Sequence, residues 1–155
     1  MEAASDDRYW DSLTCALSDR DFAACYLMGY AIETLMKTAF FRFAGVPVDA
    51  NLASSLKTAT KHPLFAASKA ASAMFAHGLH NVRAWAEYLI DARQRASGQA
   101  LDPVVAGKLI FELSRFQNNW SEVLRYRASV AASAEFARFL AIADWLRDHY
   151  AVLWR

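Results

Sequence analysis

The stretch from residue 21 to residue 43 constrains the fold most strongly, because it is apolar on almost every side when it is placed on a helix. Apolar residues recur in it at the i, i+3, i+4 and i+7 spacing of a buried face. The opposite side is also apolar, with Arg42 as its only charge. We therefore expect a central helix with neighbours on several sides. The buried stripe comprises Phe22, Cys25, Tyr26, Gly29, Ile32, Met36, Phe40 and Phe43.

A single carboxylate, Glu33, falls inside this apolar stripe. An unpaired charge is costly to remove from water, so a buried Glu needs a partner. Lys37 lies one turn further along, in the favourable order of Glu before Lys. Arg125 is the other candidate, because an arginine flanked by aromatic residues suits a buried pair. We expect Glu33 to be buried and paired with Arg125 or Lys37.

The regions on either side of this stretch predict a preceding helix and a sharp stop. Asp6 can cap a first helix over about residues 7–17. The Gly45-Val46-Pro47 sequence ends the central helix, because Gly suits the position after a helix and Pro cannot continue it. The expected inward positions of the first helix are Trp10, Leu13 and Leu17.

Three further helices are expected in the second half of the chain. One runs from Leu79 to about Arg95, and one starts at Asp102-Pro103 and runs to about Gln117. Asn118-Asn119 breaks the regular helix, and the last helix begins between Ser129 and Ser133 and continues to about Leu153. Residues 48–76 predict one or two short helices. The inward positions are Leu79, Val82, Ala86, Leu89 and Ile90; then Leu109, Ile110, Leu113 and Phe116; then Phe136, Phe139, Leu140, Ala143, Leu146 and Tyr150.

No stretch alternates with the period of two that a strand requires, and β-branched residues are scarce. The sequence predicts one all-α domain over residues 1–155, an up-and-down bundle of four to five main helices. The N-terminus lacks the features of a signal peptide, and no apolar run is long enough to span a bilayer. We therefore expect a cytoplasmic protein. Cys15 and Cys25 are too far apart for a CxxC zinc motif, so no metal site is expected.

Charge is unevenly distributed along the chain. Residues 1–50 hold four Lys or Arg against eight Asp or Glu, whereas residues 51–155 hold thirteen against eight. This asymmetry is compatible with a basic face for an anionic partner, or simply with a solvated surface. The basic surplus is smaller than in typical nucleic-acid-binding proteins.

Three sequence elements carry a family resemblance. The segment from Ala24 to Lys37 resembles a helix of prokaryotic HEPN-like proteins, whose pattern reads roughly A-x-Y-L-x-G-Y-x-x-E-x-x-L-K; here Met36 stands between the Leu and the Lys. Trp120 followed by Arg125-Tyr126 resembles the family's W-x4-RY element. His77-Gly78-Leu79 resembles its G-H-x-L helix opening with two residues exchanged. The resemblance covers most of the chain and implies a HEPN-like helical fold.

The ribonuclease members of this family carry an R-x(4–6)-H motif late in the chain, usually paired across a homodimer. In such a pair His acts as general base or acid on a 2′-hydroxyl, and Arg stabilises the charge on phosphorus-bound oxygens. None of the four histidines of this chain has an arginine at that spacing. Arg147 and His149 have the right types, but they lie about 200° apart around a helix and cannot share one face. We expect no ribonuclease centre of the family type.

Two groups of residues remain as candidate sites. Asn118, Asn119, Arg125 and Arg127 are candidates for a small anion or nucleotide pocket, with Trp120 and Tyr126 as stacking surfaces. The alternative for Arg125 is the structural pair with Glu33, which we favour. A non-standard catalytic site would be built from Glu33, Lys37, His80, Arg125 and Tyr126. His77 and His80 lack a third metal ligand, and as capping or surface residues they need no further role.

The function expected from the sequence is a HEPN-like helical binding or interaction module that is not catalytic and needs no cofactor. The alternative is an enzyme that processes RNA or a nucleotide through a non-standard, endoribonuclease-like site. Apolar surface on the central and final helices favours a homodimer. The resemblance further implies a nucleotidyltransferase-type partner protein, or a toxin–antitoxin or phage-defence setting, with weak RNA or nucleotide binding.

Overall fold

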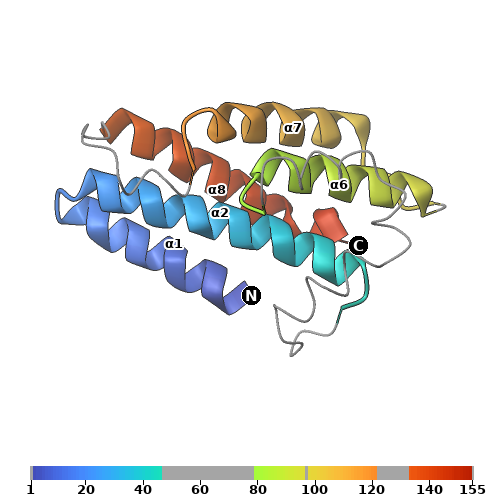
Figure 1. The fold of residues 1–155 in the computed structure, drawn as a ribbon, viewed down its shortest axis with the longest axis horizontal. Coiled ribbons are helices and arrows are strands. Elements are labelled where there is room, and N and C mark those ends of the chain that lie inside the picture. Colours follow the sequence, from blue (N-terminus) through green and yellow to red (C-terminus); the bar gives the residue numbers. More distant parts are fainter. Residues whose placement is uncertain (1, 47–78, 97, 122–132, 155) are drawn as a thin grey trace.

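The computed structural model describes residues 2–46, 79–96, 98–121 and 133–154, which form five α-helices and no strand (Figure 1). The all-α class predicted from the sequence is confirmed for this part of the chain. The expected short helices in residues 48–76 lie outside it. The helices are α1 (Glu2–Leu17), α2 (Asp21–Phe43), α6 (Val82–Arg95), α7 (Pro103–Gln117) and α8 (Ser133–Trp154).

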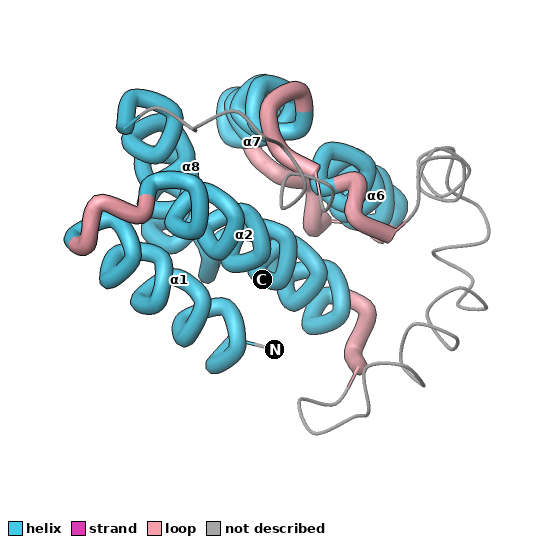
Figure 2. Tube along the Cα trace, turned by 60° about the vertical axis from the view of Figure 1, so that its left-hand side comes forward, coloured by secondary structure: helices cyan, strands magenta, loops and turns pink. Residues whose placement is uncertain are grey.

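Helix α2 is the centre of the bundle, because it packs against α1, α6 and α8. The chain direction in Figure 1 shows that α1 and α2 are antiparallel, as are α6 and α7, whereas α2 and α6 run the same way. Figure 2 shows the α1–α2 pair on one side and the α6–α7 pair on the other. No described helix has both the length and the hydropathy of a membrane span.

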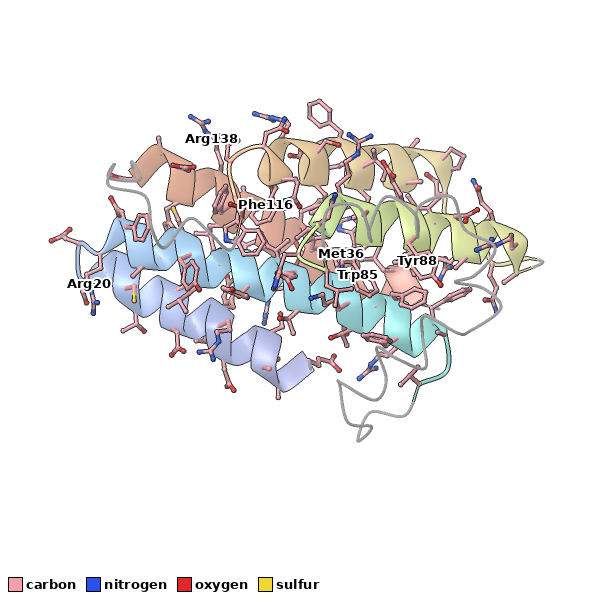
Figure 3. The ribbon with its side chains drawn as sticks, in the orientation of Figure 1. Arg20, Met36, Trp85, Tyr88, Phe116 and Arg138 are labelled. Carbon is pink, nitrogen blue, oxygen red and sulfur yellow. The ribbon has the colours of Figure 1, made fainter. Side chains whose placement is uncertain are left out.

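The predicted burial of α2 on several sides is confirmed. Figure 3 shows Met36 of α2 beside Trp85 and Tyr88 of α6, while Arg20 and Arg138 point away from the core. The opposite side of α2 is buried as well, since α1 and α8 cover it. The fully buried α2 side chains include Cys25, Met28, Ile32, Met36, Ala39 and Phe40.

Position 29 of α2 must be a glycine, because the side chain of Trp120, which follows α7 in the sequence, lies directly against it. A Cβ built on Gly29 would overlap the indole ring at Nε1, Cδ1 and Cε2. The Trp120 ring also stacks on Phe116, with centroids 5.4 Å apart, and its side chain is 1% exposed. Trp120 therefore anchors the chain that follows α7 against α2, and a residue without a side chain is required opposite it.

Helix α1 differs from its prediction in both its start and its buried face. It begins at Glu2, so Asp6 is not its cap; Asp6 lies within the helix and pairs with Arg147 of α8. The residues facing α2 are serines: Ser5 Oγ donates to the Ala31 carbonyl at 2.8 Å, and Ser12 Oγ donates to the Ala24 carbonyl at 2.7 Å. Small residues let the two helices approach closely, and their hydroxyls are satisfied by the α2 backbone.

The apolar residues expected to face inward from α1 mostly point outward. Trp10 is 60% exposed and Leu17 is 89% exposed, whereas Leu13 is partly buried against the core. The prediction for Trp10 and Leu17 was wrong because it weighed hydrophobicity alone. Two buried serines, whose hydroxyls have backbone partners, shift the contact face of α1 around its axis.

The start of α7 and the end of α2 follow the predicted capping residues, whereas the start of α6 does not. Asp102 accepts hydrogen bonds from the Val104 and Val105 amides at 2.8 and 3.2 Å, with Pro103 at the first position of α7. Gly45 has φ 71° at the end of α2. Helix α6 begins at Val82 rather than Leu79, because the Asn81 side chain accepts from the Ala84 amide at 2.9 Å and caps it.

The residues predicted to point inward from α8 are buried in the structure, except Leu140, which is only partly buried. Its C-terminal end is joined to α6 by Arg93, which is 5% exposed and donates from Nη1 to the Leu153 carbonyl at 3.0 Å. Burial lowers the pKa of Arg93. The Arg93 guanidinium also lies 5.4 Å from the ring centroid of Phe43. This cation thus connects three helices at one end of the bundle.

Candidate functional site

Three of the predicted catalytic candidates meet where the middle of α2 faces the start of α6. Glu33 and Lys37 are one turn apart on α2, and the Lys37 ammonium pairs with Glu33 Oε1. His80 lies next to the α6 cap, with Nδ1 3.1 Å from Oε1 and 3.0 Å from Oε2 of Glu33. The predicted burial of Glu33 and its pairing with Lys37 are confirmed, since the Glu33 side chain is 4% exposed.

The surroundings of this cluster are aromatic. The Lys37 Nζ atom lies 5.8 Å from the ring centroid of Trp85. The Tyr30 ring stands edge-on to His80, with centroids 6.3 Å apart, and edge-on to Trp120 at 5.4 Å. The Glu33 side chain is 4% exposed, whereas the His80 side chain is 40% exposed. Glu33 is therefore enclosed, and His80 is the member of the cluster that reaches solvent.

The chemistry open to the cluster follows from its hydrogen bonds. When Nδ1 of His80 donates to the carboxylate of Glu33, Nε2 is the ring nitrogen left to accept a proton or bind a ligand. Lys37 compensates the charge of the same carboxylate. The arrangement satisfies the buried acid, and it also fixes the orientation of an imidazole.

The sequence groups His80 with Glu33 only in the alternative catalytic site and otherwise predicts a capping or surface residue, so their direct contact is not predicted. The cap of α6 is the next residue, Asn81. The helix-opening pattern around His77-Gly78-Leu79 pointed to the correct place in the chain but not to this contact. Arg125 and Tyr126 lie outside the described residues, so the alternative pairing of Glu33 with Arg125 stays a prediction.

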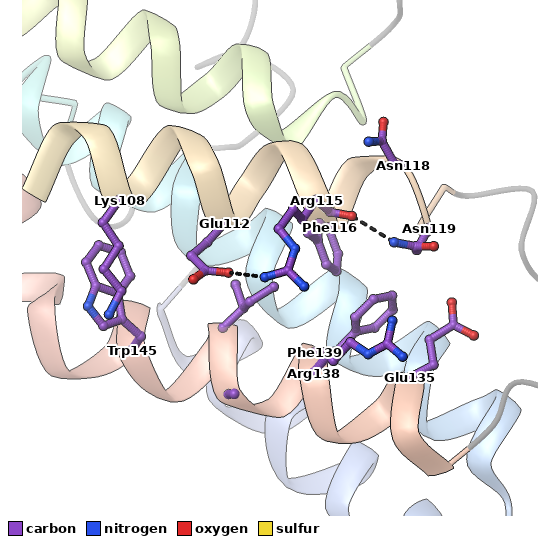
Figure 4. Close-up of a pocket in the computed structure, with 12 residues that line it drawn as sticks. Lys108, Glu112, Arg115, Phe116, Asn118, Asn119, Glu135, Arg138, Phe139 and Trp145 are labelled. Atoms are coloured by element: carbon purple, nitrogen blue, oxygen red, sulfur yellow. Dashed lines mark hydrogen bonds and ion pairs between the residues drawn. The ribbon is translucent and has the colours of Figure 1, made fainter.

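A groove of about 420 Å³ lies elsewhere, between α7 and α8 (Figure 4). Its floor includes Phe116 of α7 and Phe139 of α8, whose ring centroids are 4.7 Å apart. Figure 4 shows Lys108 and Trp145 toward one end and the asparagines that follow α7 toward the other. The residues that line the groove are Lys108, Glu112, Arg115, Phe116, Asn118, Asn119, Glu135, Arg138, Phe139, Ala141, Ile142 and Trp145.

Cations outnumber carboxylates along this groove. Arg115 is within 4.0 Å of Glu112, so part of its charge is compensated. Lys108 Nζ lies 5.0 Å from the ring centroid of Trp145, and within the described residues neither Lys108 nor Arg138 forms an ion pair. Glu135 of α8 also lines the groove and has no ion pair among the described residues, so the lining carries a surplus of one positive charge, which favours an anion.

Only some of the residues predicted to form an anion pocket lie in the described part of the chain. Asn118 and Asn119 line the groove, and Asn119 Nδ2 donates to the Arg115 carbonyl at 2.8 Å. The expectation that Trp120 offers a stacking surface is wrong, because its indole is enclosed against Gly29. Arg127, the remaining candidate, is outside the described part, as is Arg125. Nothing in the local sequence linked Lys108, Arg138 and Trp145, since they come together only through the packing of two helices.

In the part of the chain that the structure describes, no group of three or more His, Cys, Asp or Glu residues is placed to hold a metal ion. Comparison with known proteins gives no match to any family model, any curated protein or any solved structure.

Proposed function

We propose that this chain is a HEPN-like helical module that acts by binding a nucleotide-type anion in the α7–α8 groove rather than by catalysis. The observation that carries the proposal is the groove itself, where Lys108 and Arg138 form no ion pair with any described residue and lie beside an apolar floor. Its volume of about 420 Å³ falls in the range of small-molecule sites. Arg138 and Arg115 are suited to a phosphate, while Trp145, which is stacked on His149 and lies under the Lys108 ammonium, forms one end of the groove.

The enclosed state of Glu33 supports a non-catalytic reading of the other site. Its carboxylate already contacts Lys37 and His80, and its side chain is 4% exposed. A general base must reach the proton that it removes from a substrate. Glu33 is therefore proposed as a structural group that holds α2 to the start of α6.

The biological setting is proposed from the family resemblance alone. It comprises a homodimer, a nucleotidyltransferase-type partner protein, and a toxin–antitoxin or phage-defence role. Inspection of the neighbouring genes tests the partner, since an adjacent nucleotidyltransferase gene would support it. The apolar surface of α2 and α8 that suggested a dimer is largely buried inside the bundle, so a contact between copies would use other helices.

Groove binding is tested by titrating the protein into ADP that carries a fluorescent N-methylanthraniloyl group, and following its anisotropy. Arg138→Gln removes the uncompensated cation of α8 and should weaken binding about tenfold or more, as expected when a charge-assisted hydrogen bond of about 1.5–3 kcal/mol is lost. Arg83→Gln is the matched control, because Arg83 is exposed on α6 and pairs with Glu87 away from the groove. Equal affinity of the two variants, or no binding by the wild type, would reject the groove as the site.

A second function, an RNA- or nucleotide-processing enzyme, is favoured by one observation. The two Oε atoms of Glu33 hold Nδ1 of His80, which leaves Nε2 on a partly exposed ring as a potential general base. The test is incubation of labelled single-stranded RNA with the protein and a chelator, alongside His80→Ala. Cleavage that requires His80 would replace the non-catalytic proposal.

A further inference from the structure

The exposed large hydrophobic side chains of the described residues are concentrated on two helices. Trp10 and Leu17 belong to α1, Val104 and Phe111 belong to α7, and only Val152 lies on α8. Their exposures are 60%, 89%, 78%, 58% and 48% in that order. Isolated exposed hydrophobic residues need no explanation, but two pairs at i and i+7 spacing form ordered helical faces.

The outer face of α1 combines its apolar pair with acidic residues. Trp10 and Leu17 share an arc of the helix with Asp7 and Asp11, all of them exposed. Arg8 is the single cation of α1 and is 3.4 Å from Asp11, so Asp7 keeps its charge uncompensated among the described residues. We call these four residues, Asp7, Trp10, Asp11 and Leu17, the acidic face.

The solvent side of α7 carries basic side chains at the same spacing; Lys108 and Arg115 also border the α7–α8 groove, and Arg115 is within 4.0 Å of Glu112. Val104 and Phe111 alternate with Lys108 and Arg115, so that apolar and basic side chains each recur after seven residues. The Arg115 guanidinium lies 5.4 Å from the ring centroid of Phe111. We call Val104, Lys108, Phe111 and Arg115 the basic face.

The two faces lie on opposite edges of the molecule and cannot meet within one chain. Figure 1 and Figure 2 show α1 along one edge of the bundle and α7 along the other, with α2, α6 and α8 between them. The helices have nearly equal lengths, 16 residues for α1 and 15 for α7. A second copy of the chain therefore offers a helix of matching length, charge and apolar spacing.

We propose that the acidic face of one copy packs along the basic face of a second copy. Such a contact is heterologous, because it joins two different surfaces, and it leaves one free face at each end for further copies. One helix against another buries less area than a standard interface, so the association should be weak and promoted at high protein concentration. Its charge pairs are exposed, so added salt should weaken it.

The assembly is measured by sedimentation velocity of the full chain without nucleotide, from micromolar to millimolar concentration. The wild type should show a concentration-dependent increase in sedimentation coefficient that continues beyond the dimer. Trp10→Lys disables the acidic face, because it replaces an apolar contact by a charge that repels the basic face, and Phe111→Glu disables the basic face for the converse reason; neither residue lines the α7–α8 groove. Each variant alone should remain monomeric. Val152→Glu, which replaces an exposed apolar residue outside both faces, should assemble like the wild type.

Mixing the two variants distinguishes this contact from a symmetric dimer. The Trp10→Lys chain retains its basic face and the Phe111→Glu chain retains its acidic face, so an equimolar mixture should form a dimer that grows no further. Circular dichroism and thermal melts confirm that both variants are folded. A wild type that stays monomeric, variants that still assemble, or folded monomeric variants that fail to combine would each overturn the proposal.

Discussion

Replacement of Gly29 by alanine tests how α2 and the residue after α7 are packed together. In most helices this change is favourable, because alanine has a higher helix propensity than glycine by about 0.8–1.0 kcal/mol. Here the added methyl group would overlap three atoms of the Trp120 indole. The ring is enclosed between Phe116, Tyr30 and the α2 backbone, so a small shift of the indole is not available.

The expected magnitude follows from the loss of the Trp120 site. Removing a buried Trp typically costs about 3–5 kcal/mol, and the propensity gain offsets about 1 kcal/mol of this. Gly29→Ala should therefore lower the free energy of unfolding by about 2–4 kcal/mol. For a chain of this size, each kcal/mol corresponds to roughly 2–4 °C in the midpoint of a thermal melt.

Gly107→Ala is the matched control on α7, where a built Cβ has no atom within 4 Å. That change should stabilise the protein by about 0.5–1 kcal/mol. Both variants are measured by urea denaturation followed by circular dichroism. In a Trp120→Ala background, Gly29→Ala should lose its destabilising effect, because the two changes are coupled through one contact. A Gly29→Ala protein as stable as the wild type would refute the packing argument.

Three further outcomes are expected. Glu33→Ala leaves buried Lys37 without its partner and should lower the free energy of unfolding by about 3–5 kcal/mol in a denaturant titration. Glu87→Ala, at an exposed pair, should change it by under roughly 0.5 kcal/mol, and a near-neutral Glu33→Ala would contradict the buried pair. Burial raises the pKa of the Cys25 thiol from 9.0 to about 12. Between these pH values the unfolded chain loses a proton that the folded chain keeps, so the free energy of unfolding should fall as pH rises. A thermal midpoint that stays constant across pH 9–11 would oppose this. Purified protein should leave single-stranded RNA intact in the presence of chelator, with RNA binding that weakens steeply as salt rises, and reproducible cleavage that depends on His80 would reverse the assignment.

The sequence predicts the structure best where the burial, capping or charge requirement of a residue can be met by its near neighbours in the chain. The bounds of α2 were predicted because its apolar periodicity is long and a glycine ends it. The start of α7 was predicted because Asp102 and Pro103 satisfy local backbone requirements. The pairing of Glu33 with Lys37, one of the two predicted alternatives, could be predicted because the two are one turn apart on the same helix. Each of these inferences depends on residues that are close in sequence.

The parts that were missed depend on contacts between distant residues. The contact face of α1 is set by two serine hydroxyls that find carbonyl partners on α2, and hydrophobicity scales do not register such partners. His80 reaches Glu33 only because α6 packs beside α2. The α7–α8 groove combines side chains of two helices whose relative rotation the sequence does not specify.

The most direct test of groove binding is an NMR titration of the protein with ADP that follows the indole N–H signals of its tryptophans. Trp145 lines the groove, whereas Trp85 is fully buried on α6 and packs against Phe40 of α2, and the Trp145 signal is identified by its loss in Trp145→Phe. Binding in the α7–α8 groove predicts that ADP shifts the Trp145 signal in a saturable manner and leaves the Trp85 signal in place. A Trp145 signal that stays unchanged at saturating ADP would contradict it.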